Sequence, residues 1–341
     1  MVDGLLGVST HTADEPTRNE PTTRVITSGS QRRLSRLRVV VSRDANSVSM
    51  STMDLDIGCS FVFDTAVATH AVMMFEPHST ELDCVVDSRL DTEGDAAMPP
   101  SEPYLDSFDN RCRRITLNEG RTTVRFLARA NVGDEGDPID EQAELEPPMD
   151  LRDEVLQFLV PSRYCESDQV AGLAWSTFGA IESGWEKVQS VCDWVHGRTA
   201  FRYGSSSPGY SALNVLENGV GVCRDFTHLA IALCRALNIP TRYVFGYLPD
   251  IGVPDPGTPM DFCAWMEVFL AGRWFTFDPR NNEHRVGRVV VGRGRDAADV
   301  AMVTSFGTVQ MVGMTVWAEL GSGPSWNDPA LPGRDGPGLI G

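Results

Sequence analysis

The chain has 341 residues, a formal net charge of −18 and 42% hydrophobic residues. At about 150 residues per domain, this length predicts two domains. The composition excludes a collagen-like or wholly disordered chain, and no segment approaches the ~20 consecutive apolar residues that span a bilayer. The strong acidity argues against nucleic acid or an anionic membrane as a partner, because both present phosphate groups.

The two ends of the chain are predicted to be tails. Residues 1–52 lack hydrophobic periodicity over most of their length and contain no apolar core of a signal peptide. We therefore expect a disordered tail or a misassigned start there, with Met50 or Met53 as the true first residue, and a cytoplasmic protein. Residues 321–341 are rich in Gly and Pro and are predicted to form a second disordered tail.

Short apolar runs separated by turn residues fill the segment 53–133, which predicts a small β domain that resembles a sandwich. The clearest runs are Cys59–Val62, Ala71–Phe75 and Thr122–Leu127. An acidic, proline-containing segment follows at 134–150 and is predicted to be a solvated linker, with an acidic docking surface as the alternative.

The segment 151–320 begins with helical patterns and continues with strand patterns, which predicts an α+β domain. The expected helices span 151–159, 169–178, 184–197 and 223–237, and the expected strands span 241–248, 262–270, 273–278, 286–291 and 308–318.

Eight cysteines are present, and none has the spacing of a zinc site. Most are expected to be small buried side chains. Cys223 differs, because it follows a tight turn at Gly219 and Gly221 and opens a helical run that ends before Pro240. A helix N-terminus favours a thiolate, the nucleophilic form of cysteine. The alternative is a buried cysteine that happens to precede a helix.

Several blocks of sequence carry a resemblance to a known family. They are the glycine turn with Cys223, IPTRYVFGYL at 239–248, AWMEV at 264–268 and WFTFDP at 274–279. In this order they resemble the transglutaminase-like superfamily, and more narrowly its bacterial members described as cysteine proteases. Further blocks at 161–168, 193–196 and 292–299 extend the resemblance to about 53–320. DSFDN at 106–110 is similar to a D-x-F-G-N turn of the family's N-terminal domain, with Asp109 in the place of glycine.

The resemblance implies a papain-like core, in which a helix bearing the catalytic cysteine packs on an antiparallel sheet, preceded by a small all-β domain. It also implies a Cys–His–Asp triad, with Cys223 as the nucleophile and Asp278 as the acid that orients the base. Cys263 stands where the family has the histidine. Loss of one triad member costs roughly 10⁴–10⁶ in rate in comparable enzymes.

The remaining histidines offer one candidate base. His284 follows Asp278 by six residues, whereas His228 lies about 140° around its helix from Cys223 and is expected to be structural. The others are His11, His70, His78 and His196. A reversible disulfide between Cys223 and Cys263 is a further hypothesis.

Two functions from different classes remain open. The first is thiol acyl transfer on peptide or protein carboxamides, by an amidase, peptidase or transglutaminase-type reaction, impaired by Cys263. The second is a catalytically inactive pseudoenzyme that binds peptide or amide groups in the same cleft, with Tyr203, Tyr210, Trp265 and Trp274 as possible lining residues. A metal site of Cys223, Cys263 and Asp278 lacks a fourth ligand, so neither a metal nor a cofactor is expected. The sequence predicts no oligomeric state.

Overall fold

The computed structural model describes residues 51–94, 102–254 and 256–321. All of these residues belong to one compact unit. The two predicted tails therefore fall almost wholly outside the described residues. Within the described part, no helix has both the length and the apolar character needed to cross a membrane.

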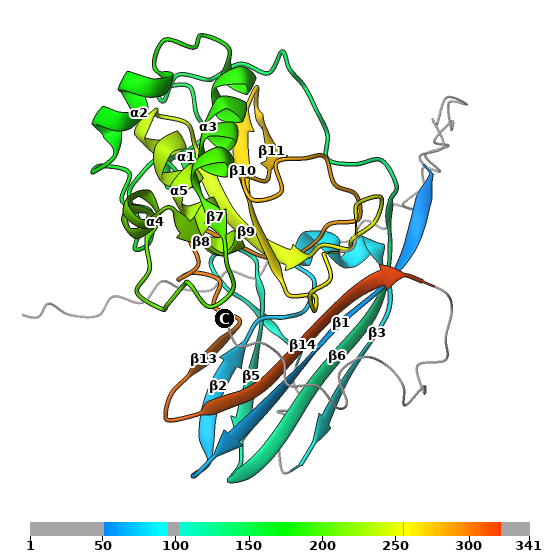
Figure 1. The fold of residues 1–341 in the computed structure, drawn as a ribbon. Coiled ribbons are helices and arrows are strands. Elements are labelled where there is room, and N and C mark those ends of the chain that lie inside the picture. Colours follow the sequence, from blue (N-terminus) through cyan, green and yellow to red (C-terminus); the bar gives the residue numbers. More distant parts are fainter. Residues whose placement is uncertain (1–50, 95–101, 255, 322–341) are drawn as a thin grey trace, which may run out of the picture. The chain divides into compact units, whose positions relative to one another are not determined.

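The first part of the described chain is built from strands (Figure 1). Side chains near the ends of β1 alternate in burial, whereas the five residues Ile57–Phe61 in its middle are all buried, so this stretch is covered on both faces. The elements are β1 (Thr52–Thr65), β2 (Thr69–Met73), the 3₁₀ helix η1 (Ser79–Cys84), β3 (Val85–Glu93), β4 (Tyr104–Leu105), β5 (Arg111–Leu117) and β6 (Gly120–Gly133).

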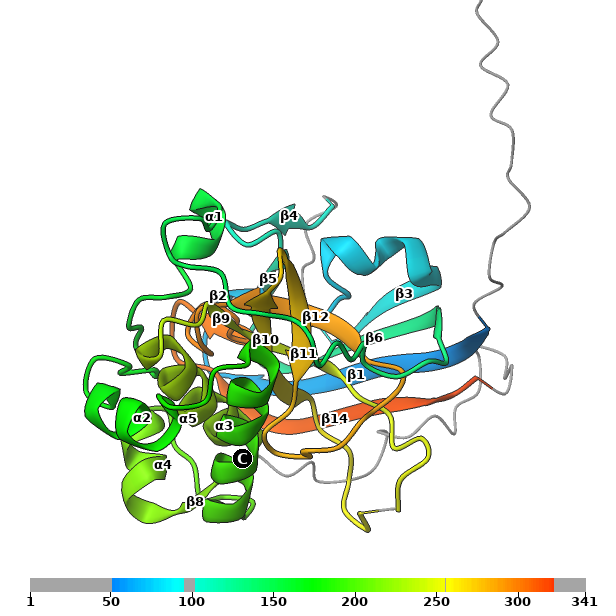
Figure 2. The ribbon, with the colours of Figure 1, turned by 90° about the horizontal axis from the view of Figure 1, so that it is seen from above.

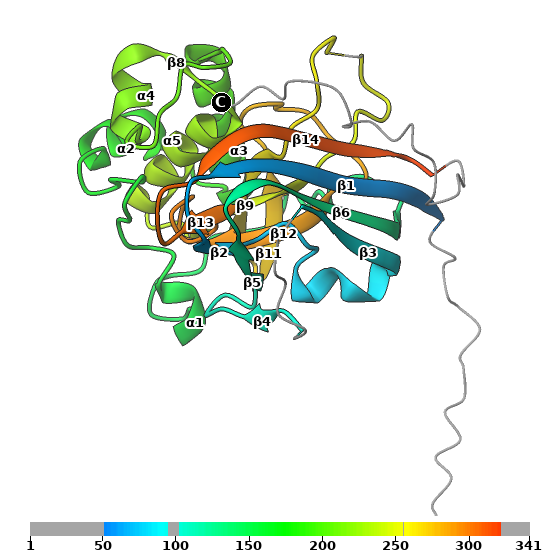
Figure 3. The same ribbon diagram turned by 90° about the horizontal axis from the view of Figure 1, so that it is seen from below.

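These strands form two four-stranded antiparallel sheets that also contain the last two strands of the described chain. The orders are β14-β1-β6-β3 and β13-β2-β5-β4, where β13 is Val303–Ser305 and β14 is Gln310–Leu320. β14 pairs with β1 over ten residues (Figure 3). Gly58 makes this pairing possible at one point, because a Cβ atom there would lie 2.2 Å from the Trp317 ring. The C-terminal strand, which the sequence assigned to the domain 151–320, thus lies in a sheet of the N-terminal strands.

The second part contains the helices and a third sheet. The helices are α1 (Asp153–Leu156), α2 (Ala171–Phe178), α3 (Gly184–Arg198), α4 (Ala212–Asn218) and α5 (Cys223–Ala236). The sheet has the order β11-β10-β9-β12, formed by β9 (Thr241–Tyr247), β10 (Cys263–Leu270), β11 (Arg273–Phe277) and β12 (Val289–Gly294). α5 contacts β9 and β10 as well as α2, α3 and α4, so it is the central helix (Figure 2). The predicted α+β fold, with β strands followed by helices on an antiparallel sheet, is confirmed.

Local differences from the sequence prediction have simple causes. The helix expected at 151–159 shortens to the four residues of α1. α4 was not predicted, because seven residues are too few for a clear helical period. The turn at 106–110 has the shape that the family pattern suggested: Asp109 has φ +63°, and Asp106 Oδ1 accepts hydrogen bonds from the backbone N–H groups of Phe108 and Asn110.

One hydrophobic core runs through both parts of the described chain. Phe262, which precedes β10, packs against Tyr247 and against Phe61 on β1, with ring centroids 5.0 and 6.5 Å away. The Tyr247 hydroxyl donates a hydrogen bond to the carbonyl oxygen of Phe75 at 2.9 Å. Strands of the N-terminal sheets therefore support the start of β10, where Cys263 lies.

Candidate functional site

Cys223 is the first residue of α5, and the preceding turn fixes its position. Gly219 ends α4 with φ +64°, a conformation that glycine adopts without strain. The short parallel pair of β7 (Ala200–Phe201) and β8 (Val220–Gly221) then leads to the helix. A Cβ atom on Gly221 would lie 2.6 Å from Cβ of Asp225, so only glycine fits there.

Hydrogen bonds around Asp225 stabilise the first turn of α5. Its fully buried carboxylate accepts hydrogen bonds from the Val222 N–H at 2.9 Å and from the Ser206 hydroxyl at 3.0 Å. The Thr227 hydroxyl donates to the carbonyl oxygen of Cys223 at 2.9 Å. The helix dipole and the free N–H groups of this rigid turn favour negative charge at the Cys223 thiol.

The structure brings Cys263 directly beside Cys223. Cys263 begins β10, on which α5 packs, and a hydrogen bond joins the two thiols. This bond is the largest influence on both: it lowers the pKa of Cys223 below its usual value and raises the pKa of Cys263 well above it. The pair therefore resembles a thiolate that accepts a hydrogen bond from a neutral thiol. Both are free thiols in the structure, and a disulfide between them stays a prediction.

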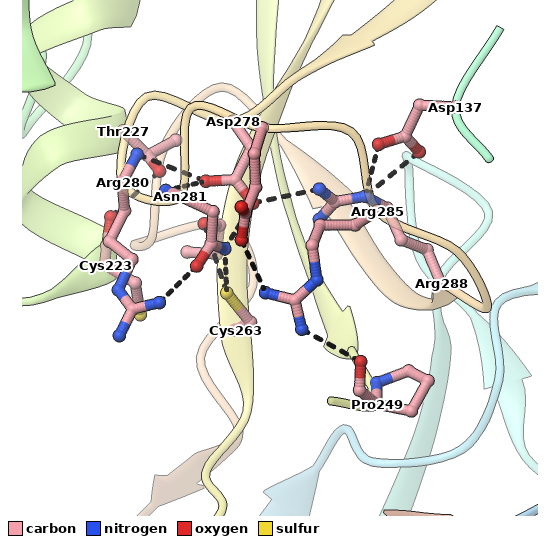
Figure 4. A network of polar contacts seen from close by, with 12 residues as sticks. Asp137, Cys223, Thr227, Pro249, Cys263, Asp278, Arg280, Asn281, Arg285 and Arg288 are labelled. Carbon is pink, nitrogen blue, oxygen red and sulfur yellow. Dashed lines mark hydrogen bonds and ion pairs between the residues drawn. The ribbon is translucent and has the colours of Figure 1, made fainter. Parts of the chain in front are cut away.

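Asp278 follows β11 on the same sheet and belongs to a compact polar network (Figure 4). Its carboxylate accepts hydrogen bonds from the backbone N–H groups of Arg280 and Asn281, from Asn281 Nδ2 at 2.7 Å and from Arg288 Nη2 at 2.9 Å. Burial alone would raise its pKa, but the Arg288 charge and these hydrogen bonds outweigh burial and lower it. Asp278 is thus a fixed carboxylate.

Asn281, which was not among the predicted site residues, connects this carboxylate to the Cys263 thiol. Its Nδ2 group lies 2.7 Å from Asp278 Oδ2 and 3.9 Å from Cys263 Sγ. The three predicted residues, Cys223, Cys263 and Asp278, therefore form one site through Asn281. No pattern in the sequence DPRNN at 278–282 marks this role.

Two charged residues that support Asp278 were also missed. Arg288 Nε donates to both oxygens of Asp137 at 3.0 Å, and its guanidinium lies 4.7 Å from the centroid of the buried Trp265 ring. Asp137 belongs to the segment 134–150, predicted to be a solvated linker. This carboxylate instead helps to hold the site, and no local pattern in the sequence marks such a contact.

No histidine of the described chain supplies a base to Cys223. The neighbours of His284 and His196 are backbone carbonyl groups, of Asp137 and Arg280. His228 is fully buried, accepts a hydrogen bond from the Ala297 N–H and stacks on Tyr164. Burial and the charges of nearby arginines hold its pKa well below the usual value. Of the remaining two, His70 forms a hydrogen bond with Thr116 within an N-terminal sheet, and His78 forms hydrogen bonds with Thr80 in η1 and with the carbonyl oxygen of Phe108.

Three of the aromatic residues proposed to line a cleft make contacts within the fold. Trp265 is fully buried, and Trp274 packs against Phe269 and under Arg242. Tyr210 donates its hydroxyl to the carbonyl group of Val220. Among the described residues, no three His, Cys, Asp or Glu side chains gather as a metal would require.

Comparison with known proteins identifies the family of the chain. The model of the "Transglutaminase-like superfamily" matches residues 173–279, which include Cys223, Cys263 and Asp278. The crystal structure of a "putative cysteine protease" from Cytophaga hutchinsonii is 30% identical and superposes with a TM-score of 0.69, over 79% of this chain and 91% of that one. The chain belongs to the transglutaminase-like superfamily.

Curated relatives of this transglutaminase-like protein are similar over shorter segments. An uncharacterized protein of Mycobacterium leprae is 30% identical over 45% of this chain and 54% of its own length. One from Mycobacterium tuberculosis is 36% identical over 34% of this chain and 40% of its own length. The matched segments thus span about half or less of the curated relatives.

Proposed function

We propose that this chain carries out thiol acyl transfer of the amidase or peptidase type on peptide or protein carboxamides, with Cys223 as the nucleophile. The observation that carries the proposal is the position of Cys223 at the N-terminus of α5, beside a thiol that lowers its pKa. A thiolate at neutral pH attacks a carbonyl carbon far more readily than a thiol does. No cofactor, nucleic acid or membrane takes part in this proposal.

Asp278 has a positioning role in the proposed reaction. In a Cys–His–Asp triad the carboxylate orients the imidazole. Here the Asp278 carboxylate accepts hydrogen bonds from Asn281 and Arg288, and the side-chain amide of Asn281 also contacts the Cys263 thiol. We infer that Asp278 holds Asn281, and through it Cys263, in the geometry that supports the Cys223 thiolate.

A second candidate is a pseudoenzyme that binds peptide or amide groups. The observation that favours it is Cys263 itself, because a neutral thiol with a raised pKa is a poor substitute for the histidine that the family resemblance implies. In that case, Cys223 and Asp278 would be retained for binding and packing only.

Release of ammonia or amine from peptide carboxamides separates the two candidates. Wild type is compared with Cys223→Ala, which removes the nucleophile, and with Cys263→His, which restores the family's residue. Acyl transfer predicts measurable turnover by wild type, none by Cys223→Ala and faster turnover by Cys263→His. Turnover by Cys263→His alone, with an inert wild type, would favour the pseudoenzyme.

A further inference from the structure

A positively charged side chain, that of Arg280, lies beside the thiols, and the reaction proposed above gives it no role. Arg280 stands two residues after Asp278, and its backbone N–H donates a hydrogen bond to that carboxylate at 3.1 Å. Its guanidinium donates through Nη1 to the side-chain oxygen of Asn281, whose Nδ2 atom lies 3.9 Å from Cys263 Sγ. One end of the guanidinium is therefore fixed next to the Cys263 thiol.

Phe201 contacts the same guanidinium from another part of the chain. The Cζ atom of Arg280 lies 4.6 Å from the centroid of the Phe201 ring. Phe201 belongs to β7 and pairs with Gly221 on β8, two residues before Cys223. Arg280 thus extends from the loop after β11 to the strand pair that leads to the nucleophile. Figure 4 shows its side chain on the side of the network where Cys223 lies, and its charge lowers the pKa of that thiol.

No carboxylate of the described chain forms an ion pair with the Arg280 guanidinium. Its neighbour in the network, Arg288, pairs by contrast with both Asp278 and Asp137. The chain has 47 acidic residues against 29 lysines and arginines, so a shortage of carboxylates does not explain the difference. Within the described residues, only Nη1 of Arg280 forms a hydrogen bond, which leaves the N–H groups of Nε and Nη2 for a ligand.

The aromatic surface that supports Arg280 is open to a ligand. Phe201 is 37% exposed, and the half-buried Tyr203 ring packs edge-on against it, with the centroids 5.0 Å apart. Stacking on Phe201 occupies one face of the planar guanidinium. The N–H groups of Nε and Nη2 lie along its edge, where they match the two oxygens of a carboxylate. This arrangement suits a carboxylate on a short apolar chain, as in an aspartate or glutamate side chain.

We propose that Arg280, stacked on Phe201, binds a carboxylate of the substrate, so that the carboxamides on which Cys223 acts belong to acidic peptides. This inference rests on the acyl-transfer function proposed above and names its substrate class. Nε and Nη2 donate to the two carboxylate oxygens, and the acidic side chain packs on the Phe201 and Tyr203 rings. The peptide is thereby held at the Cys223 thiol. Arg280 determines specificity and takes no part in making or breaking bonds.

Alkylation of Cys223, followed by peptide mapping, tests the subsite without requiring turnover. Iodoacetate and iodoacetamide react with the same thiolate, and only iodoacetate carries a carboxylate, so the ratio of their rate constants cancels any change in the thiolate fraction. Arg280→Gln should lower the ratio of iodoacetate to iodoacetamide about 10-fold, the effect of one charge-assisted hydrogen bond. Arg280→Lys, which keeps the charge but loses the planar fork, should give an intermediate ratio.

The matched control is Arg114→Gln on β5. Arg114 also stacks on an aromatic ring, with its Cζ atom 4.4 Å from the centroid of Tyr104, but it lies in an N-terminal sheet. This variant should keep the wild-type ratio of the two alkylation rates. A fall in both arginine variants would mean that the effect comes from the net charge of the protein and not from a subsite at Arg280.

A pair of esters extends the test to acyl transfer. Mono-p-nitrophenyl adipate and p-nitrophenyl hexanoate have acyl chains of equal length, and only the adipate chain ends in a carboxylate. The p-nitrophenol burst reports acylation, and its amplitude counts folded sites in each variant. The burst should be faster with the adipate ester in wild type, and this preference should fall about 10-fold in Arg280→Gln.

The two proposals fail in different ways. An unchanged ratio in Arg280→Gln, with either pair of reagents, would overturn the carboxylate subsite and leave acyl transfer by Cys223 standing. Absence of a burst with both esters in wild type would instead contradict acyl transfer, and with it acidic peptides as substrates, whatever the alkylation ratio.

Discussion

Arg288 Nη2 donates a hydrogen bond to Asp278 Oδ2 at 2.9 Å, although both side chains are almost completely buried. The same guanidinium is bound through Nε by Asp137, which lies 141 residues before Asp278 in the chain. Two carboxylates therefore share one buried cation at the base of the site. Because burial of an unpaired charge is costly, this pairing ties the segment before α1 to the loop after β11.

Replacement of Arg288 should destabilise the protein strongly. Arg288→Leu leaves Asp278 and Asp137 buried without their cation, and loss of one member of a buried ion pair costs about 3–5 kcal/mol. Urea unfolding measures the change in free energy. Arg121→Leu is the matched control, since it removes an exposed ion pair with Asp64 and should change stability little. Equal losses in the two variants would contradict the structural role of Arg288.

Cys263 should activate Cys223. Cys263→Ala removes the hydrogen bond that lowers the Cys223 pKa, so the thiolate fraction and the rate of iodoacetamide alkylation at pH 7 should both fall. Peptide mapping by mass spectrometry follows Cys223 specifically. Cys84→Ala is the control, because burial raises the pKa of that thiol to about 11 and it lies away from the site, at the end of η1. Faster alkylation in Cys263→Ala would reverse the assignment of donor and acceptor.

The turn before Cys223 should tolerate no side chain. In Gly221→Ala the new Cβ atom would lie 2.6 Å from Cβ of Asp225, which must shift and disturb the start of α5. We expect a lower Tm and slower alkylation of Cys223. Gly172→Ala in α2 is the control, since a Cβ atom there meets nothing within 4 Å and alanine favours a helix by about 1 kcal/mol. Equal behaviour of both variants would argue against the close packing at Gly221.

His228 should make the protein less stable as the pH falls. Burial, followed by the charges of Arg224 and Arg235, holds its pKa well below the usual value, so it stays neutral in the folded state. The unfolded chain takes up a proton near pH 6.5, and below that pH it binds more protons than the folded chain. Stability should therefore fall by up to about 1.4 kcal/mol per pH unit.

Urea unfolding between about pH 7.5 and pH 5.5, in wild type and His228→Gln, measures this contribution. The variant should show a shallower slope. Asp261 acts with the opposite sign, because its raised pKa makes the folded chain bind more protons up to about pH 6. The contribution of His228 is therefore the difference between the two proteins in the pH dependence of the free energy of unfolding. Identical slopes of this free energy against pH would show that His228 is not held neutral.

The sequence predicted those parts of the site that local patterns encode. Two glycines followed by a helical run located Cys223, and the family blocks located Cys263 and Asp278. Asn281, Arg288 and Asp137 were not predicted. The contact between Arg288 and Asp137 joins residues 151 positions apart, so it leaves no local periodicity in the sequence. The pairing of β14 with β1 was missed for the same reason. The strand pattern at 308–318 predicts that a strand forms there, but the identity of its partner depends on the hydrophobic faces of distant strands.

The most direct test of the account is the identity of the residue that becomes acylated. Wild-type protein is incubated with p-nitrophenyl acetate, quenched in acid and mapped by mass spectrometry of its peptides. The account predicts one acetyl group on Cys223, in about one copy per chain, and none on that peptide in Cys223→Ala. Acetyl groups spread over the other cysteines, or absent from Cys223, would contradict it.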